Sequence, residues 1–276
     1  MKIVSFLFFY ILVSVFKIDA QSTASKQVNT FIIDAPQLQT QKTIWVYLPK
    51  GYNDSNSSYQ VIYMHDAQNL FDEKTSYVGE WKIDEYLDAL ETNPSIIVGI
   101  EHGNEKRIDE LTPFTNEKYG GGKADAYLNF IIETLKPVVD STYRTLSSKE
   151  NTIIWGSSLG GLTSLYAVLK YPATFGKAGV FSPAIWINKD ELFRFIASSN
   201  IDSNKKFYFL VGSEEGKSTD SISIMVTDQH EIVKLLKEKG VNNNHIIDRV
   251  IPEGHHNETL WSTNFPEAYQ WLINND

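Results

Sequence analysis

The sequence predicts an α/β fold, a three-layer sandwich in which helices cover both faces of a mostly parallel central sheet. Apolar strand-like segments alternate with helix-like segments along the 276-residue chain. Strands that connect through helices run parallel and are buried on both faces, which fits strand segments that are apolar throughout. The chain has no internal repeat and no linker long enough to divide it. We therefore expect a single domain at residues 21–276.

The strand-like segments fall into two groups. Residues 30–33 and 43–48 are rich in β-branched and aromatic side chains and precede the alternating part of the chain. We expect these two segments to pair as an antiparallel edge of the sheet. The other strands are expected at residues 60–64, 95–100, 151–155, 177–181, 206–211 and 245–251.

Helices are expected between these strands. The longest, at residues 123–143, is predicted to be one continuous α-helix with an apolar face. That face carries Leu128, Ile131, Ile132, Leu135, Val138 and Val139. The remaining helices are expected at residues 81–90, 161–170, 190–197, 227–239 and 260–273.

Residues 1–20 are predicted to be a secretory signal peptide. Lys2 precedes an apolar stretch of about 14 residues, which is short for a membrane span and typical of a signal sequence. Ala20 is the expected cleavage point, and an uncleaved N-terminal anchor is the alternative. We therefore expect a secreted or periplasmic protein with no stable membrane insertion after cleavage.

Composition excludes several classes of protein. The chain has no cysteine, so disulfides, thiolate catalysis and cysteine-bound zinc are excluded. Its formal net charge is −9 and its basic residues are scattered, which makes nucleic acid and anionic membranes poor partners. His230 and Glu231 open like a zinc-binding H-E-x-x-H motif, but Lys234 stands where the second histidine is needed. Nothing in the sequence indicates an oligomeric state.

The segment at residues 151–161 is the most informative part of the chain. An apolar strand leads into Gly156-Ser157-Ser158-Leu159-Gly160, which fits G-x-S-x-G, and a helix follows at once. Strand, sharp glycine-bounded turn and helix are the setting of a nucleophile elbow, and glycine is used where side chains would collide with neighbouring elements. Ser158 is therefore the expected nucleophile. It lies at a helix N-terminus, which favours developing negative charge.

A serine nucleophile needs a base and a supporting acid. In hydrolases built on such elbows, the three residues occur in the order serine, acid, histidine. The turn after the strand at residues 206–211 offers Glu215, which we favour, and Glu214. The loop after the last strand offers His255 and His256.

The oxygen that becomes negative during attack on an acyl carbon needs two N–H donors. One expected donor is the amide of Leu159, the residue after the nucleophile. The loop after the third strand offers the amides of Ala67 and Gln68 as the second. Asp66 is expected to organise this loop rather than to react.

Several segments, in the same order along the chain, resemble the esterase family of α/β-hydrolases that includes esterase D, feruloyl esterases and enterochelin esterases. The resemblance covers nearly the whole mature chain and implies an α/β-hydrolase fold. It also implies hydrolysis of carboxylic esters without a metal or an organic cofactor. The segments that carry it are residues 61–72, 79–84, 107–113, 120–145, 155–161, 181–183, 211–215 and 254–261.

The resemblance implies roles for individual residues. The late histidine of the family pattern, which precedes a tryptophan by a few residues, falls on His256, and the family's acid falls on Glu215. Many members have glycine where this chain has Ala67, and the methyl group is expected to narrow the site slightly. The residues expected to shape the substrate pocket are Trp81, Arg107 and Trp186. For the two tryptophans, packing in the hydrophobic core is the alternative role.

The expected activity is hydrolysis of a small-molecule or oligosaccharide ester, such as an acylated polysaccharide fragment. Two alternatives use the same triad: hydrolysis of a siderophore trilactone, and transfer of the acyl group to a hydroxyl instead of water. A carbohydrate-binding protein without catalysis is a further alternative. Serine, acid and histidine in register argue against it, because a binding module does not need them.

Overall fold

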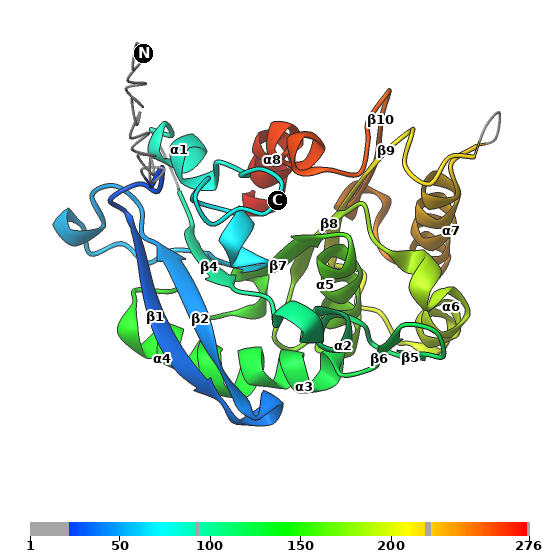
Figure 1. Ribbon diagram of the computed structural model, residues 1–276, viewed down its shortest axis with the longest axis horizontal. Coiled ribbons are helices and arrows are strands. Elements are labelled where there is room, and N and C mark those ends of the chain that lie inside the picture. The colour runs from blue at the N-terminus through cyan, green and yellow to red at the C-terminus, as the bar shows by residue number, and fades with distance from the viewer. Residues whose placement is uncertain (1–21, 92–93, 219–221, 275–276) are drawn as a thin grey trace, which may run out of the picture.

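The structure is a computed structural model that describes residues 22–91, 94–218 and 222–274. The expected signal peptide at residues 1–20 lies outside these ranges. The described chain is built around one eight-stranded sheet in the order β1-β2-β4-β3-β7-β8-β9-β10 (Figure 1). No helix in the described ranges is long and apolar enough to cross a membrane.

The sheet is antiparallel only at its N-terminal edge. β1 (Val28–Ala35) and β2 (Thr40–Tyr47) pair antiparallel, and β2 also runs antiparallel to β4 (Ile96–Ile100). All other pairs in this sheet are parallel, which confirms the predicted architecture. The parallel strands are β3 (Val61–His65), β7 (Thr152–Ser157), β8 (Lys177–Phe181), β9 (Lys206–Gly212) and β10 (Ile246–Ile251). A separate two-stranded ribbon, β5 (Thr115–Asn116) and β6 (Gly120–Gly121), was not predicted.

Helices cover both faces of the sheet. α1 (Ile83–Asp88) and α8 (Glu258–Ile273) pack on one face, where they share a hydrophobic cluster with the strands (Figure 1). A second cluster on the other face joins the strands to the remaining helices. The α-helices with residues in that cluster are α2 (Arg107–Leu111), α3 (Ala124–Asn129), α4 (Lys136–Thr142), α5 (Leu159–Lys170), α6 (Lys189–Ser198) and α7 (Ile224–Glu238).

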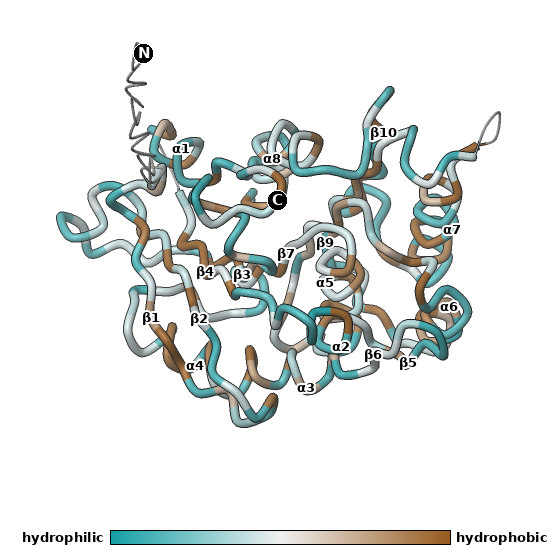
Figure 2. Tube along the Cα trace, viewed as in Figure 1, coloured by the Kyte–Doolittle hydropathy of each residue, from teal (hydrophilic) through white to brown (hydrophobic). Residues whose placement is uncertain are grey.

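The central strands are hydrophobic along their whole length because both of their faces are buried. In β7, Ile153 and Trp155 pack on the side of α8, whereas Ile154 packs on the opposite side. Hydrophobic stretches accordingly gather in the sheet, while many outer loops are hydrophilic (Figure 2). Successive side chains of these strands point to opposite faces of the sheet, and both faces can be apolar because helices cover both of them.

The predicted helix at residues 123–143 is not one continuous α-helix. α3 passes into a π-helical segment, Phe130–Leu135, before α4 begins. Pro137 follows this segment, and proline lacks the N–H that an α-helix needs at that point. A π turn rotates the chain less per residue, so Val138 faces away from the core and is 39% exposed. The prediction that Val138 lies on the apolar face is therefore wrong.

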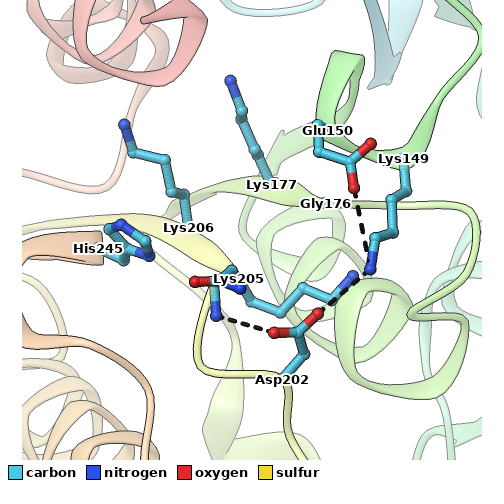
Figure 3. Close-up of a pocket in the computed structure, with 9 residues that line it drawn as sticks. Lys149, Glu150, Gly176, Lys177, Asp202, Lys205, Lys206 and His245 are labelled. Carbon is cyan, nitrogen blue, oxygen red and sulfur yellow. Dashed lines mark hydrogen bonds and ion pairs between the residues drawn. The ribbon is translucent and has the colours of Figure 1, made fainter. Parts of the chain in front are cut away.

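The amino ends of β8 and β9 hold the C-terminus of α8. Lys177 Nζ donates to the carbonyl of Leu272 at 2.7 Å, and Lys206 Nζ donates to that of Asn274 at 3.0 Å. The last carbonyls of a helix lack intrahelical donors and carry partial negative charge, so these lysines stabilise it. Both lysines extend to the same side of a cavity of about 280 Å³ (Figure 3). This cavity lies at the amino ends of the strands, opposite the site described next.

Candidate active site

Ser158 lies on the sharp turn between β7 and α5. Its φ of 57° and ψ of −119° are unusual for a residue with a side chain. Its N–H donates to the carbonyl of Phe181 at 2.9 Å, and its carbonyl accepts from the N–H of Ala184 at 3.0 Å. The end of neighbouring strand β8 and the segment after it therefore hold the turn in place. The predicted strand, turn and helix are confirmed.

The glycines of the elbow allow three elements to approach closely. A Cβ atom on Gly156 would lie 2.8 Å from Cδ2 of His65, and one on Gly161 would lie 2.6 Å from the carbonyl oxygen of Phe181. A Cβ on Gly160 would lie 3.1 Å from the Cβ of His65. These separations leave no room for a side chain at Gly156 or Gly161. His65 is fully buried beneath the turn, and burial lowers its pKa to about 4.

A histidine and a buried carboxylate meet beyond the ends of β9 and β10. His256 Nδ1 lies 2.7 Å from Glu215 Oε2. The other carboxylate oxygen, Oε1, accepts from the N–H of Gly212 and from Ser182 Oγ, each at 2.7 Å. Both oxygens of Glu215 therefore have partners, as a buried carboxylate requires.

The sequence offered two adjacent acids and two adjacent histidines, and the structure distinguishes between the members of each pair. Glu214 is paired with Lys217 at 3.0 Å, and its hydrogen bond with Lys217 holds the pKa of this carboxyl below its usual value. His255 is exposed and makes no described contact with Glu215. Glu215 and His256 are thus the pair that the fold brings together.

The turn that carries Glu215 and the loop that carries His256 lie against each other. A Cβ atom on Gly212 would come within 2.2 Å of the carbonyl oxygen of Gly254. The N–H of Glu214 donates to that same carbonyl at 3.0 Å. Glycine at both positions lets the two backbones cross closely enough for the acid to reach the histidine.

Ser182 and Trp261 support this pair, and sequence reasoning gave neither of them a role. Trp261 Nε1 donates to Ser182 Oγ at 2.8 Å, and Ser182 in turn donates to Glu215. The Trp261 ring stands nearly perpendicular to the His256 ring, with centroids 5.0 Å apart. Both residues lie in segments that carry the family resemblance. That was the available signal, but no motif assigns them a function.

Backbone N–H groups without an acceptor inside their own helix or turn occur directly after Ser158 and in the loop after β3. Leu159 begins α5, so its N–H has no acceptor inside the helix. The loop after β3 continues into a short 3₁₀ turn, Ala67–Asn69, whose hydrogen bonds start from the N–H groups of Asn69 and Leu70. The N–H groups of Ala67 and Gln68 stay outside these bonds. They are thus candidates to bind a negative oxygen.

The Ala67 side chain does not narrow the site. It is buried, and a Cβ atom on Gly99 of β4 would lie only 2.8 Å from its methyl group. The methyl group therefore points into the sheet and away from the cavity beside Ser158. This corrects the expectation drawn from the glycine of related sequences.

Asp66 and Arg107 join the loop after β3 to α2. Arg107 Nε lies 2.7 Å from Oδ1 of Asp66, and Arg107 Nη2 lies 2.8 Å from Oδ2 of the same carboxylate. Burial raises the pKa of the Asp66 carboxyl, but the Arg107 charge and its hydrogen bonds outweigh this and hold the pKa below its usual value. Asp66 thus organises the loop, as expected, and Arg107 is already occupied by a carboxylate.

Ser158 and His256 line one cavity of about 250 Å³. Its volume suits a small ligand or the end of a larger one. Glu258, the first residue of α8, also lines it, and burial raises the pKa of its carboxyl. Sequence reasoning missed Glu258. The other lining residues are Asp66, Gln68, Asn69, Tyr77, His102, Arg107, Ser157 and Trp261.

The two tryptophans predicted to contact substrate lie elsewhere. Trp81 is 4% exposed and packs in the core, with its ring centroid 5.8 Å from that of Phe181 and 6.0 Å from that of Trp261. Its role is packing beneath the site, because the α8 side of the sheet buries it. Trp186 is half exposed on the surface against Tyr119 and does not line the cavity. Of the three predicted pocket residues, only Arg107 reaches the cavity.

The mostly parallel sheet, the serine elbow and the late histidine define an α/β-hydrolase. Residues 35–272 match the model of the family described as "Putative esterase". This chain belongs to that family, and it is a carboxylic-ester hydrolase.

Individual relatives agree with this assignment. The chain is 28% identical to "Uncharacterized protein YbbA" of Bacillus subtilis over 235 residues, covering 82% of this chain and 90% of that protein. It is 26% identical over 209 residues to "Ferri-bacillibactin esterase BesA" of the same species, covering 67% and 70% of the two chains. The BES protein of Bacillus cereus has a similar structure, with a TM-score of 0.72 at 19% identity, covering 94% and 99% of the chains. At that identity the structural likeness shows the fold alone.

Proposed function

We propose that this protein hydrolyses esters through an acyl-enzyme formed on Ser158, with His256 as the base and Glu215 as the supporting acid. The observation that carries the proposal is the 2.7 Å contact between His256 and buried Glu215 at a cavity that Ser158 also lines. A carboxylate bound to Nδ1 holds its proton there and leaves Nε2 free to accept one. The strained turn presents the serine at the same cavity.

The proposed reaction has two halves. Ser158 Oγ attacks the acyl carbon while His256 Nε2 takes the serine proton, and the proton then passes to the alcohol as it leaves. Water next attacks the acyl-enzyme, gives its proton to His256, and releases the carboxylic acid as Ser158 regains its proton. The amides of Leu159 and of Ala67 or Gln68 stabilise the oxyanion in both halves.

Alanine at Ser158 tests the nucleophile. The Ser158→Ala variant is expected to lose at least about 10³-fold in kcat on p-nitrophenyl acetate, because it removes the hydroxyl that forms the acyl-enzyme in the proposed reaction. The control is Ser164→Ala, since the Ser164 hydroxyl is buried in α5 and bonded to the carbonyl of Gly160. Equal activity in wild type and Ser158→Ala would exclude this mechanism.

For the substrate, we propose an uncharged carboxylic ester of a small alcohol or sugar. Besides two histidines, His102 and His256, the cavity is lined by the carboxyl groups of Asp66 and Glu258, and its one lining arginine is already bound to Asp66. Such a lining disfavours a strongly anionic ligand. Acylated oligosaccharides and simple acyl esters fit this condition.

Hydrolysis of a siderophore lactone is the second candidate, because relatives carry such names. One is the "Siderophore enterobactin esterase" of Emericella nidulans, 34% identical over 92 residues, which cover 32% of this chain and 30% of that protein. A panel of p-nitrophenyl esters, acetylated xylo-oligosaccharides and a catecholate trilactone, with and without iron, separates the two. We expect kcat/KM for neutral esters to exceed that for the ferric trilactone by about tenfold or more, a difference of about 1.4 kcal/mol. A higher kcat/KM for the ferric trilactone than for the neutral esters would instead identify the protein as a siderophore esterase.

We also propose that the enzyme is exported and that residues 21–276 remain as one mature domain. The support is the sequence pattern of residues 1–20. N-terminal sequencing of the protein from fractionated cells tests this. A mature chain that starts at Gln21 outside the cytoplasm is expected, and an intact Met1 in the cytoplasmic fraction would contradict it.

A further inference from the structure

Three carboxyl groups converge at the start of α1, and none of them lines the catalytic cavity. One oxygen from each of Glu80, Asp84 and Glu85 lies within 4.8 Å of the others. Asp84 is fully buried and Glu80 nearly so, whereas Glu85 is exposed. Two of the three carboxyl groups have therefore been removed from water while lying close to a third.

Asp84 has an oxygen with no partner in spite of its burial. Its Oδ2 accepts from the N–H of Ser25 at 2.6 Å, but Oδ1 has no hydrogen-bond donor among the described residues. Two nearby carboxylates, by contrast, accept hydrogen bonds from hydroxyl groups. Asp72 accepts from the Ser22 hydroxyl at 2.6 Å and Asp88 from the Ser25 hydroxyl at 2.7 Å. The oxygen without a partner is thus a particular feature of Asp84, the fully buried member of the cluster.

The cluster has no cationic side chain bound to it. No lysine, arginine or histidine in the described ranges forms an ion pair with Glu80, Asp84 or Glu85. Buried carboxylates that repel one another need either a proton or a bound cation to coexist.

The spacing of the oxygens suits a calcium ion. Calcium binds six to eight oxygens at about 2.3–2.6 Å, so oxygens on opposite sides of the ion lie about 5 Å apart. Carboxylate oxygens within 4.8 Å of one another can therefore surround one ion, with water completing its shell. Magnesium requires about 2.0–2.1 Å and near-ideal octahedral geometry, which a set of ligands from one short segment meets less easily.

We propose that Glu80, Asp84 and Glu85 bind a structural calcium ion. The same carboxyl groups hold the start of the described chain, which lies beside α1 (Figure 1). Thr23 Oγ1 donates to the two oxygens of Glu80 at 3.2 and 3.3 Å, and the Ser25 N–H donates to Asp84. A bound ion would therefore fix these acceptors and tie residues 22–25 to α1. The site is independent of the proposed catalytic residues.

Calcium-dependent thermal stability tests the proposal. Protein stripped with chelator is melted in metal-free buffer with 0–10 mM CaCl2, with MgCl2 and NaCl of matched ionic strength as comparators. Wild type is expected to gain about 3 °C or more in Tm with calcium, along a saturating curve, because a ligand bound only by the native state stabilises it. Isothermal titration with CaCl2 should give one ion per chain.

Variants locate the ion. Asp84→Asn and Glu85→Gln are each expected to remove most of the calcium-dependent rise in Tm. Glu85→Gln changes an exposed side chain and keeps the test valid if Asp84→Asn fails to fold. Glu238→Gln, at the exposed end of α7, is the matched control and should keep the full rise. No rise in wild type beyond that with NaCl, or an equal rise in Glu85→Gln, would overturn the proposal.

Discussion

Glu215 is the residue on which the proposed chemistry depends most visibly. It accepts two hydrogen bonds on Oε1 and contacts His256 through Oε2. In Glu215→Gln an amide replaces the carboxylate, and either the His256 contact or the Oε1 contacts lose their acceptor. We expect kcat to fall about 10³–10⁴-fold on p-nitrophenyl acetate, because the imidazole loses its orientation and its charge partner.

The neighbouring carboxyl group provides the control for this variant. Glu214→Gln removes only the exposed pair with Lys217, and exposed pairs contribute little, so its kcat should stay within about twofold of wild type. If Glu214→Gln were the inactive variant and Glu215→Gln the active one, the acid would be assigned wrongly.

Ser182 and Trp261 are predicted to act through Glu215 as positioning residues. Ser182→Ala and Trp261→Phe each break the chain of hydrogen bonds from Trp261 to the acid. We expect each to lower kcat about tenfold with little change in KM, because a buried group left without a partner costs about 1–3 kcal/mol. The double variant should be far less impaired than the product of the single effects. Independent, multiplying effects would argue against one shared network.

At the scale of elements, the crossing of the acid turn and the histidine loop is the tightest contact in the site. Gly212→Ala would place a Cβ atom 2.2 Å from the carbonyl oxygen of Gly254, so the two loops must separate. We expect loss of most activity and a free energy of unfolding about 1–3 kcal/mol lower in urea titrations. Gly51→Ala is the control, since a Cβ there meets nothing within 4 Å and the cost is limited to its φ of 74°, about 1–2 kcal/mol. Full activity in Gly212→Ala would contradict the close approach of the turn that carries Glu215 and the loop that carries His256.

The elements were predictable where periodicity was simple. Strands β3, β4 and β7 are short apolar runs bounded by polar turns, and the structure places them within a residue or two of the predicted positions. The π-helical segment before Pro137 was not predictable from periodicity, because 3.6-residue spacing assumes an unbroken α-helix. The ribbon β5–β6 was missed because its strands are only two residues long.

At the scale of the whole molecule, buried Lys205 makes stability depend on pH. Its ammonium group donates to the carbonyls of Pro172 and Phe175, and burial lowers its pKa from 10.5 to about 8. The unfolded chain therefore binds more protons than the native protein between these pH values. Stability contributed by this group must consequently rise as the pH increases from about 8 to 10.5.

Comparison with Lys205→Met isolates this effect. Urea unfolding at pH 7 and pH 10 should show wild type gaining about 1–3 kcal/mol relative to the variant at the higher pH. Lys26→Met, at an exposed lysine, controls for the loss of one positive charge and should show no such trend. A constant difference between wild type and Lys205→Met would show that the native state does not disfavour the ammonium.

The sequence by itself determined the α/β architecture, the serine on its elbow and the short lists of acid, base and amide candidates. These follow from local signals: apolar periodicity, glycines beside a serine, and polar turns after strands. Only the tertiary structure decided which candidates meet. It paired Glu215 with His256, put Trp81 in the core, and brought Ser182, Trp261 and Glu258 to the site. The physical reason is that these residues lie at the ends of different strands and helices, so their distances depend on how the sheet twists and the loops cross. It also buried Asp84 among carboxylates, which no local pattern records.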